Sequence, residues 1–226
     1  MSEAAVSDRL APGEMTLAEL RRALAPHLAE AAAFDGWSAK AVASAAAALG
    51  ADPRHAALAF DGPADMIAAW IETVDAAMAD AIPAGELAGL KIRERIRRLV
   101  MTRLDAARPV REALRRALAI LAMPQNLKLA ARLGWASADV MWRAAGDTAT
   151  DYNHYTKRAT LGAVYAATLA VFVDDTSEGE AETAAFLDRR IDGIMRFEKA
   201  KARVLKPADA HFSLVRLAGR LRYPAK

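Results

Sequence analysis

Residues 38–66 read SAKAVASAAAALGADPRHAALAFDGPADM, and this stretch is the strongest local indication of the fold. Ser38 is a residue type that caps helix starts, and Gly50 is one that ends helices in the left-handed conformation. Pro53 suits the first position of a short second helix, because its missing N–H has no helical partner there. The turn at 61–63 then leads into another helix. The spacing predicts a helix-turn-helix arrangement followed by a longer helical segment.

The sequence on both sides of this stretch also has a helical pattern. Hydrophobic residues make up 54% of the 226 residues, with only 12 Gly and 9 Pro, and no segment alternates as a strand does. Thr16 and Glu19 have the spacing of a capping box. We therefore predict an all-α fold. The expected helices are 16–34, 38–49, 53–60, 64–81, 86–107, 110–122, 123–145 with Gly134 as a candidate interruption, 151–173, 179–204 and 209–221.

Charge is distributed unevenly, although the net charge is only +3. Residues 91–116 hold ten basic and three acidic side chains, whereas residues 172–188 hold six acidic side chains and no basic one. Residues 189–226 are again basic, with eleven basic and three acidic side chains. Such blocks indicate either an anionic partner at the basic segments or solvated helix faces, and the sequence leaves both interpretations open.

Composition excludes several classes of protein. The chain has no cysteine, so disulfide frameworks and thiolate-bound zinc or iron–sulfur clusters are excluded. No segment reaches about 18 apolar residues without a charge, so we expect no transmembrane helix. Residues 1–15 lack the basic start and apolar run of a signal peptide. We therefore expect a cytoplasmic protein.

Residues 38–66 resemble the start of a TetR-type transcriptional regulator. In that family the first three helices bind DNA and the remaining helices enclose a ligand. The charges disfavour DNA binding here, because the short second helix offers only Arg54 and His55 to a groove. Between residues 34 and 65, four aspartates outnumber two basic side chains. We predict an architectural role for this unit and no nucleic-acid partner, and we keep a TetR-type ligand-responsive regulator as the alternative function.

Three further stretches resemble the family of the coenzyme Q biosynthesis protein Coq nine. They are LAILAMPQN at residues 118–126, VMWRAAGDTATDYNHYTKRATLGAVY at residues 140–165, and FLDRRIDGIM at residues 186–195. The resemblance implies a TetR-like helical bundle without DNA binding, usually a homodimer, with an isoprenoid or phospholipid ligand in an apolar pocket. It also implies presentation of the ligand to the di-iron demethoxyubiquinone hydroxylase. We therefore expect a lipid-binding accessory protein of ubiquinone biosynthesis rather than an enzyme.

Two sets of candidate site residues follow from this resemblance. Apolar residues at helical spacing are core residues in most proteins, but the resemblance points to a pocket among them. The predicted lipid-binding residues are Met66, Trp70, Val74, Leu127, Leu161, Val164, Tyr165, Leu169 and Phe172. The aromatic side chains at the start of helix 151–173 are expected to meet the hydroxylase. This chain has a histidine there, where eukaryotic members often carry a tryptophan. The predicted partner-binding residues are Trp142, Asp151, Tyr152, His154, Tyr155 and Arg158.

The sequence offers little support for a catalytic centre. The four histidines are scattered, and no Glu-x-x-His pair, glycine-rich phosphate loop or Gly-x-Ser-x-Gly turn occurs. Asp147 and Asp151 either hold a metal or cap the turn and the next helix, and their position favours capping. Lys157 and Arg158 either bind an anionic head group or pair with those aspartates. We predict no catalytic residue, no cofactor and no metal.

The C-terminal segment has an amphipathic and basic pattern. This pattern favours reversible contact with an anionic membrane, and docking on the protein's own core is the alternative. The predicted membrane-contact residues are Leu214, Arg216, Leu217, Arg220, Leu221 and Arg222. We expect a protein peripheral to the inner membrane, with these parts: a helix-turn-helix-like unit at 1–62, a helical lipid-binding body at 63–205 and a basic tail at 206–226.

Overall fold

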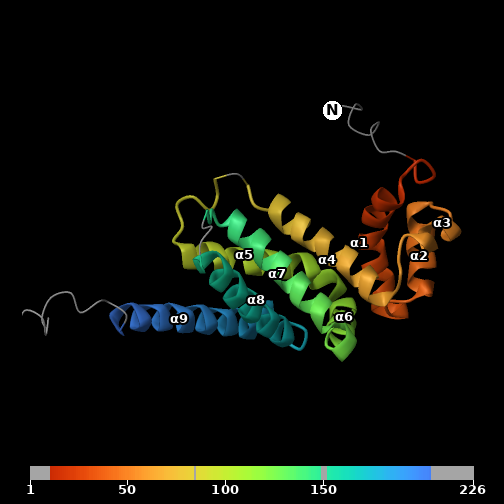
Figure 1. Ribbon diagram of the computed structural model, residues 1–226. Helices are drawn as coiled ribbons and strands as arrows, with labels where there is room; N and C mark the ends of the chain where they lie inside the picture. Colours follow the sequence, from red (N-terminus) through yellow and green to blue (C-terminus); the bar gives the residue numbers. More distant parts are fainter. Residues whose placement is uncertain (1–10, 84, 149–151, 205–226) are drawn as a thin grey trace, which may run out of the picture. The chain divides into compact units, whose positions relative to one another are not determined.

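The computed structural model describes residues 11–83, 85–148 and 152–204, with side chains described at these positions except 152, 153 and 198–204. Throughout the described residues the regular structure is helical, without strands, which confirms the predicted all-α class (Figure 1). The α-helices are α1 (Leu17–Asp35), α2 (Ala39–Leu49), α3 (Pro53–Leu58), α4 (Pro63–Asp80), α5 (Ile92–Ala107), α6 (Arg111–Leu121), α7 (Leu127–Ala144), α8 (Tyr152–Phe172) and α9 (Ala181–Val204). Short 3-10 helices are η2 (Arg108–Val110), η3 (Pro124–Asn126) and η4 (Glu178–Glu180).

The ends of the first two helices follow the predicted capping residues. The Thr16 N–H donates to Glu19 Oε2 (2.8 Å), and the Glu19 N–H donates back to Thr16 Oγ1 (3.3 Å). Ser38 caps α2 by accepting from the Ala41 N–H (3.4 Å). Gly50 ends α2 with φ +73°, in the left-handed region that a side chain would strain. Both the capping box and the glycine stop are therefore confirmed.

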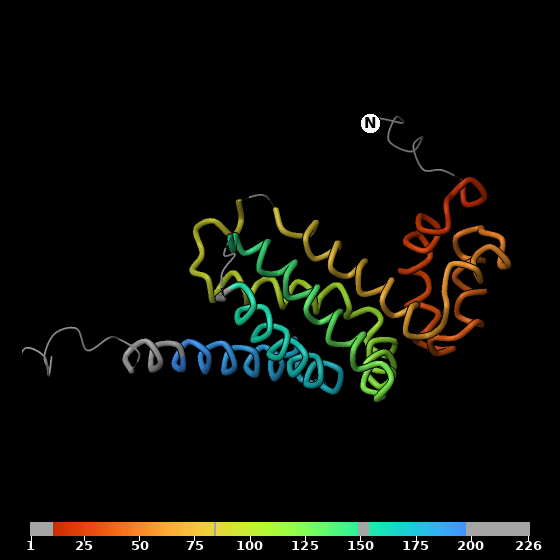
Figure 2. The backbone as a smooth tube through the Cα atoms, in the orientation of Figure 1, coloured from red at the N-terminus to blue at the C-terminus, as the bar shows by residue number. Residues whose placement is uncertain are grey.

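Trp37 connects the first three helices to the helices that follow. Its Nε1 donates to the carbonyl of Ala113 on α6 (3.0 Å), and its ring packs against Trp70 of α4 at a centroid distance of 5.5 Å. Arg21 of α1 forms an ion pair with Asp65 at the start of α4. Figure 2 shows the chain leading from α3 directly into α4. Contacts group residues 1–187 into one unit, so the predicted boundary at residue 62 lies inside that unit.

The fifth helix begins later than the sequence pattern predicts. The predicted helix starts at Glu86, whereas α5 starts at Ile92. The Lys91 N–H donates to Glu94 Oε2 (3.0 Å), which satisfies a backbone group at the helix start. The Arg95 side chain donates to three backbone carbonyls, including those of Leu90 and Ala88, each at 2.9 Å. Two carbonyls before α5, those of Ala88 and Leu90, are thus satisfied by a side chain instead of by further helical turns.

The predicted interruption at Gly134 is wrong, because α7 runs through this residue as a regular helix. A Cβ built on Gly134 would meet no atom within 4 Å, and one built on Gly162 of α8 would lie 3.5 Å from the Gly134 carbonyl oxygen, an ordinary contact distance. The backbone of α7 at Gly134 thus lies against α8 at Gly162.

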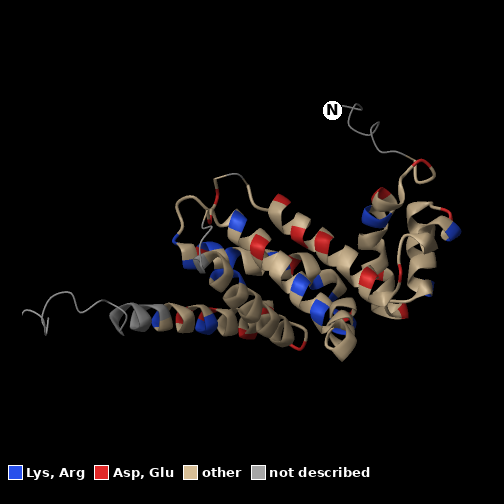
Figure 3. Ribbon diagram, viewed as in Figure 1, with Lys and Arg blue, Asp and Glu red and all other residues tan. Residues whose placement is uncertain are grey.

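Part of the basic segment 91–116 is neutralised by the acidic segment of the same chain. Lys and Arg are frequent along α5 and α6 (Figure 3). Arg108 Nε donates to Glu180 Oε1 (2.8 Å), Arg111 pairs with the same carboxylate, and Arg115 pairs with Asp174. The counter-ions of these arginines are thus intramolecular, and neither solvent nor an outside anion is needed to pair them.

The second unit comprises residues 188–226 and is helical as far as Val204, the end of α9. This end matches the predicted helix 179–204. The predicted helix 209–221 and the predicted tail 206–226 lie outside the described residues. The same holds for the predicted membrane-contact residues, which are Leu214, Arg216, Leu217, Arg220, Leu221 and Arg222.

Candidate functional site

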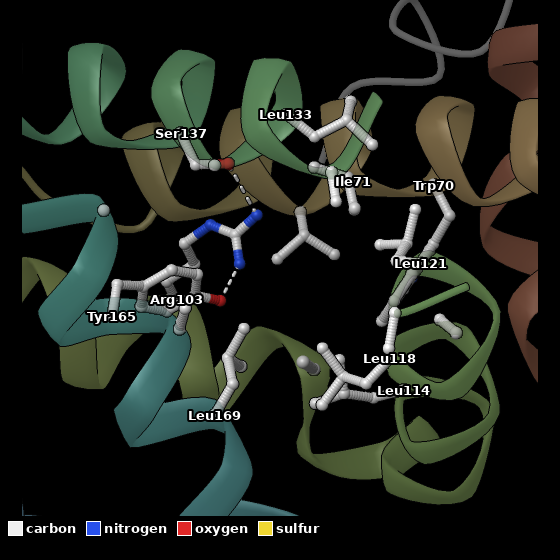
Figure 4. Close-up of a pocket in the computed structure, with 18 of the residues that line it drawn as sticks. Trp70, Ile71, Arg103, Leu114, Leu118, Leu121, Leu133, Ser137, Tyr165 and Leu169 are labelled. Atoms are coloured by element: carbon white, nitrogen blue, oxygen red, sulfur yellow. Dashed lines mark hydrogen bonds between the residues drawn. The ribbon is translucent and has the colours of Figure 1, made fainter. Parts of the chain in front are cut away.

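A cavity of about 260 Å³ lies among α4, α5, α6, α7 and α8 (Figure 4). Its wall is mostly apolar, and small residues such as Ala117 and Gly134 leave the space that larger side chains would fill. Leu127 lies on the wall and is 55% exposed, so the cavity reaches the surface beside the start of α7. The volume is near the lower end of the usual range for small-molecule sites, about 300–1,000 Å³.

The structure divides the predicted lipid-binding residues into two groups. Those on the cavity wall are Trp70, Val74, Leu127, Tyr165 and Leu169. The others are buried by helix packing and do not line this cavity: Met66, Leu161, Val164 and Phe172. Phe172, for example, is covered by the Arg111 guanidinium at 4.3 Å from its ring centroid. A helix buried on more than one side carries several apolar stripes, so helical spacing alone does not identify the cavity-facing one.

One end of the cavity is polar. Arg103 of α5 reaches it and donates from Nε to Asp75 of α4 (2.6 Å), from Nη1 to the Tyr165 hydroxyl, and from Nη2 to Ser137 Oγ (3.0 Å). Ser137 in turn donates to the second oxygen of Asp75 (2.9 Å). Figure 4 shows the guanidinium between Ser137 and Tyr165, with leucines at the other end of the cavity. A buried polar cluster, in which each side-chain nitrogen and oxygen has at least one hydrogen-bond partner, therefore closes an otherwise apolar space.

Burial affects both ionisable groups that border the cavity. Burial raises the pKa of the Tyr165 hydroxyl above its ordinary value, in spite of the adjacent guanidinium. Burial alone lowers the pKa of Arg103, but Tyr165 and Asp75 favour the charged form and leave its pKa above the ordinary value. At neutral pH the cavity therefore presents a cationic guanidinium, balanced by a carboxylate, and a protonated hydroxyl.

Sequence reasoning missed three members of this cluster: Asp75, Arg103 and Ser137. A signal was present for two of them. Asp75 lies next to Val74 and three residues before Met78, on the buried side of α4. Arg103 lies between the buried positions Leu99, Val100 and Leu104 of α5. A charged residue within an apolar helix stripe is costly unless it is paired, so each one predicts a buried partner.

The Ala-Gly-Asp turn before α8 is held to the start of that helix by ion pairs. Asp147 accepts from Lys157 Nζ (2.7 Å) and from Arg158 Nη1 (3.2 Å), and Arg158 Nε also donates to Asp139 of α7 (2.5 Å). Lys157 and Arg158 therefore both pair with Asp147, which is one of the two interpretations that the sequence left open for these cations. Arg158 is only 2% exposed, so it fixes the geometry of the turn and does not offer its charge to a partner protein.

Aromatic side chains of α7 and α8 meet at the surface. The Trp135 ring lies 6.0 Å from the Tyr155 ring and 6.5 Å from the His154 ring, and His154 meets Tyr155 edge-on at 5.2 Å. Tyr155 is 61% exposed and Trp135 is 37% exposed. We call Trp135, His154 and Tyr155 the aromatic cluster. Trp135 was not predicted, because it lies 19 residues before His154 and only the pairing of α7 with α8 brings it there.

The other predicted partner-binding residues lie around this cluster or outside the described part. Trp142 is half-buried, and its Nε1 donates to the Lys157 carbonyl (3.0 Å). Asp151 and the Tyr152 side chain lie outside what the structure describes. Within the described residues, no group of three or more His, Asp or Glu side chains is placed to hold a metal ion. Within the same ranges, no helix combines the length and apolarity needed to cross a membrane.

Fold and cavity define a class of protein, an all-helical chain of TetR-like architecture. The structure resembles the crystal structure of a TetR transcriptional regulator from Nitrosomonas europaea, with a TM-score of 0.61 and 24% sequence identity. The likeness covers 76% of this chain and 96% of that one. It confirms the predicted fold, and at this level of identity it carries no information about DNA binding.

The sequence resembles a known family. A sequence model of COQ9 matches residues 127–198, which include α7 and α8. The chain is 31% identical to the mitochondrial ubiquinone biosynthesis protein COQ9 of Rattus norvegicus and 30% identical to that of Homo sapiens, in each case over 77% of its length. It is thus similar to the COQ9 proteins over most of its sequence. The matched region covers 58% and 57% of those two proteins, so the chain spans little more than half the length of these relatives.

Proposed function

We propose that this protein is a lipid-binding accessory protein of ubiquinone biosynthesis, which holds an isoprenoid or quinone intermediate and presents it to the demethoxyubiquinone hydroxylase. Relatives over most of the chain are named ubiquinone biosynthesis proteins. The apolar cavity carries the proposal, because α7 and α8 of its wall lie in the region matched by the family. The protein supplies binding and orientation in this role, and its partner supplies the chemistry.

The cavity suits an apolar chain for simple energetic reasons. Its wall is formed by side chains such as Val74, Leu114 and Leu121, which offer no hydrogen bonds to displaced water. Each methylene group that leaves water contributes about 0.8 kcal/mol to binding. The exposed position of Leu127 on the wall lets a chain longer than the cavity continue outwards.

The aromatic cluster supports the partner part of the proposal. Exposed tyrosine and tryptophan side chains are the residues that most often dominate protein–protein affinity. Trp135 and Tyr155 offer such area, and His154 adds a ring with hydrogen-bonding nitrogens. The Arg158–Asp139 ion pair holds the α8 start against α7, so the cluster is presented on a fixed frame.

We also propose reversible contact with a membrane surface through the basic segment 206–226, because a lipid carrier must exchange its cargo with a bilayer. Co-sedimentation with anionic and neutral vesicles tests this. Binding is expected only to anionic vesicles, and it should fall as salt rises. Equal binding to both kinds of vesicle, or to neither, contradicts an electrostatic contact.

The central experiment is lipid extraction from the purified full chain, followed by mass spectrometry. Isoprenoid, quinone or phospholipid is expected in a fixed ratio to protein. Ala130→Trp places an indole in the cavity wall and should remove the lipid, whereas Ala131→Trp places one at an exposed position of α7 outside the wall. Circular dichroism checks that both variants stay helical. An absence of lipid from the wild-type protein, or equal lipid in both variants, contradicts the proposal.

A further inference from the structure

The cavity is chemically asymmetric along its length. Its buried end carries Arg103, Ser137 and Tyr165, each at most 4% exposed, whereas the end toward Leu118 and Leu127 is apolar and reaches the surface. A space for a plain hydrocarbon needs no such polar end, and a buried ion pair costs desolvation energy. The asymmetry therefore points to a ligand that also has one polar end.

The hydrogen bonds at the polar end leave several donors available to a ligand. A guanidinium has five N–H groups, and the three bonds of Arg103 use one at Nε and one at each terminal nitrogen. Both Asp75 oxygens already accept, one from Arg103 and one from Ser137. The Tyr165 hydroxyl accepts from Arg103 and keeps its own hydrogen to donate. A hydrogen-bond acceptor of a ligand placed here would meet the unused N–H groups of Arg103 and the Tyr165 O–H.

The charge at this end argues for a neutral acceptor. Arg103 is balanced by Asp75 at 2.6 Å, so the cluster carries no net charge. A phosphate or carboxylate beside it would be a buried anion with no counter-charge of its own, which is strongly unfavourable. A carbonyl or phenolic oxygen gains the donors without that penalty.

We infer that the cavity binds its ligand with a neutral carbonyl or phenolic oxygen first, hydrogen-bonded to Arg103 and Tyr165, and with the apolar chain directed past Leu118 to the surface at Leu127. This inference rests on the proposed function and specifies its ligand as an oxygen-bearing ring with a hydrocarbon tail. The ester carbonyl of a lipid shares this chemistry and is the second source to be distinguished.

The orientation has a consequence for presentation of the ligand. Along α7, Ser137 at the polar end is two residues from Trp135, whereas Leu127 at the apolar end is eight residues away. Along α8, Tyr165 is nearer to Tyr155 than Leu169 is. The oxygen-bearing end of the ligand therefore lies at the end of the cavity that is nearer, along both helices, to the aromatic cluster.

Calorimetric titration with chain-matched probes tests the inference on the full chain freed of lipid. The probes are decyl-1,4-benzoquinone, methyl decanoate, decyl phosphate and decylbenzene, which has no oxygen. Tyr165→Phe removes only the hydroxyl and is expected to weaken quinone binding about five- to tenfold, with less than about a twofold change for decylbenzene. Leu169→Ala, in the apolar wall, should weaken both probes alike.

The outcomes separate the inference from the function proposal. If no probe binds the wild-type protein, the cavity function itself fails. If quinone and decylbenzene bind but respond equally to Tyr165→Phe, or if decyl phosphate binds as tightly as the quinone, the oxygen-first orientation is overturned. If only the ester binds and responds to Tyr165→Phe, the oxygen anchor stands and the quinone assignment falls.

A spectroscopic measurement keeps the test decisive if Tyr165→Phe does not fold. Infrared spectra of carbonyl-labelled decylbenzoquinone bound to the wild-type protein are compared with spectra in hydrocarbon solvent. The stretch of one carbonyl is expected at lower wavenumber in the protein, because hydrogen bonds from Arg103 and Tyr165 weaken that bond. Two carbonyl bands at their hydrocarbon positions would overturn the inference.

Discussion

Arg103 and Asp75 form an ion pair in the interior of the helical body, with Nε 2.6 Å from Oδ1 and side chains that are 5% and 10% exposed. The pair joins α5 to α4, and through Ser137 and Tyr165 it also reaches α7 and α8. Four helices of the cavity wall therefore depend on one guanidinium. This arrangement makes the polar end of the cavity rigid, which a site that orients its ligand requires.

Removal of one member of this pair should be far more harmful than removal of both. Arg103→Met leaves the Asp75 carboxylate buried without a cation, and we expect a loss of about 3–5 kcal/mol in the free energy of unfolding. The double variant Arg103→Met, Asp75→Leu should recover most of that loss. Urea titration followed by circular dichroism measures both. Arg98→Met breaks the exposed pair with Glu86 and serves as the control, with a loss below about 1 kcal/mol. If Arg103→Met is as stable as Arg98→Met, the prediction is contradicted.

Asp175 gives a prediction for pH dependence. Burial raises the pKa of Asp175, but hydrogen bonds from Ser177 and Thr183 outweigh it and hold the pKa well below the usual range. The Thr183 N–H and hydroxyl donate to Asp175 Oδ2 at 2.8 and 2.6 Å, which links the loop after α8 to the first turn of α9. Asp175→Ala is expected to cost about 1–3 kcal/mol of stability at pH 7.

The sign of the pH effect follows from the lowered pKa. The ionised carboxylate stabilises the folded state fully above the unfolded-state pKa of about 3.9, and this contribution is lost as pH falls toward the folded-state pKa. The gap in unfolding free energy between wild type and Asp175→Ala should therefore be constant near neutral pH and shrink below about pH 4. Asp174→Ala, whose carboxylate is exposed and pairs with Arg115, should show a smaller and flatter difference. A gap that does not change down to pH 3 would contradict this account.

The local features of the fold could be predicted from the sequence because they depend on neighbours in the chain. Thr16 and Glu19 are three residues apart, and Gly50 alone permits the left-handed stop of α2. Helical period likewise placed Trp70, Val74 and Tyr165 on buried faces. Each of these predictions needed only spacing and residue type.

Features that depend on partners distant in the sequence were not predicted. Arg103 contacts Asp75, 28 residues away, and Tyr165, 62 residues away. The periodicity of a single helix does not show contacts between different helices. Arg108 meets Glu180 across 72 residues, so the charge blocks were assigned to solvent or to outside partners. The cavity depends on where α4 to α8 leave space between them, and that is a property of packing rather than of any single stripe.

The TetR-like fold makes DNA binding the alternative to be tested directly. The basic side chains of the short helix α3 are Arg54 and His55, and Asp52 caps this helix. We expect no DNA complex in a gel-shift assay at 50 mM salt. A complex that weakens by orders of magnitude between about 50 and 200 mM salt would show phosphate contacts and favour a regulator.

The aromatic cluster yields the test of partner binding. Tyr155→Ala removes a 61% exposed ring that packs on Trp135 and His154, and it breaks no hydrogen bond of the helix backbone. We expect affinity for the demethoxyubiquinone hydroxylase of the same organism to fall at least about tenfold, as for a central aromatic residue of an interface, with unchanged thermal unfolding. Phe34→Ala removes an 85% exposed aromatic side chain at the end of α1 and should leave affinity unchanged. Surface plasmon resonance with the immobilised hydroxylase measures both variants. Equal affinities for wild type and Tyr155→Ala would remove the cluster from the interface, and equal losses in both variants would indicate nonspecific hydrophobic contact.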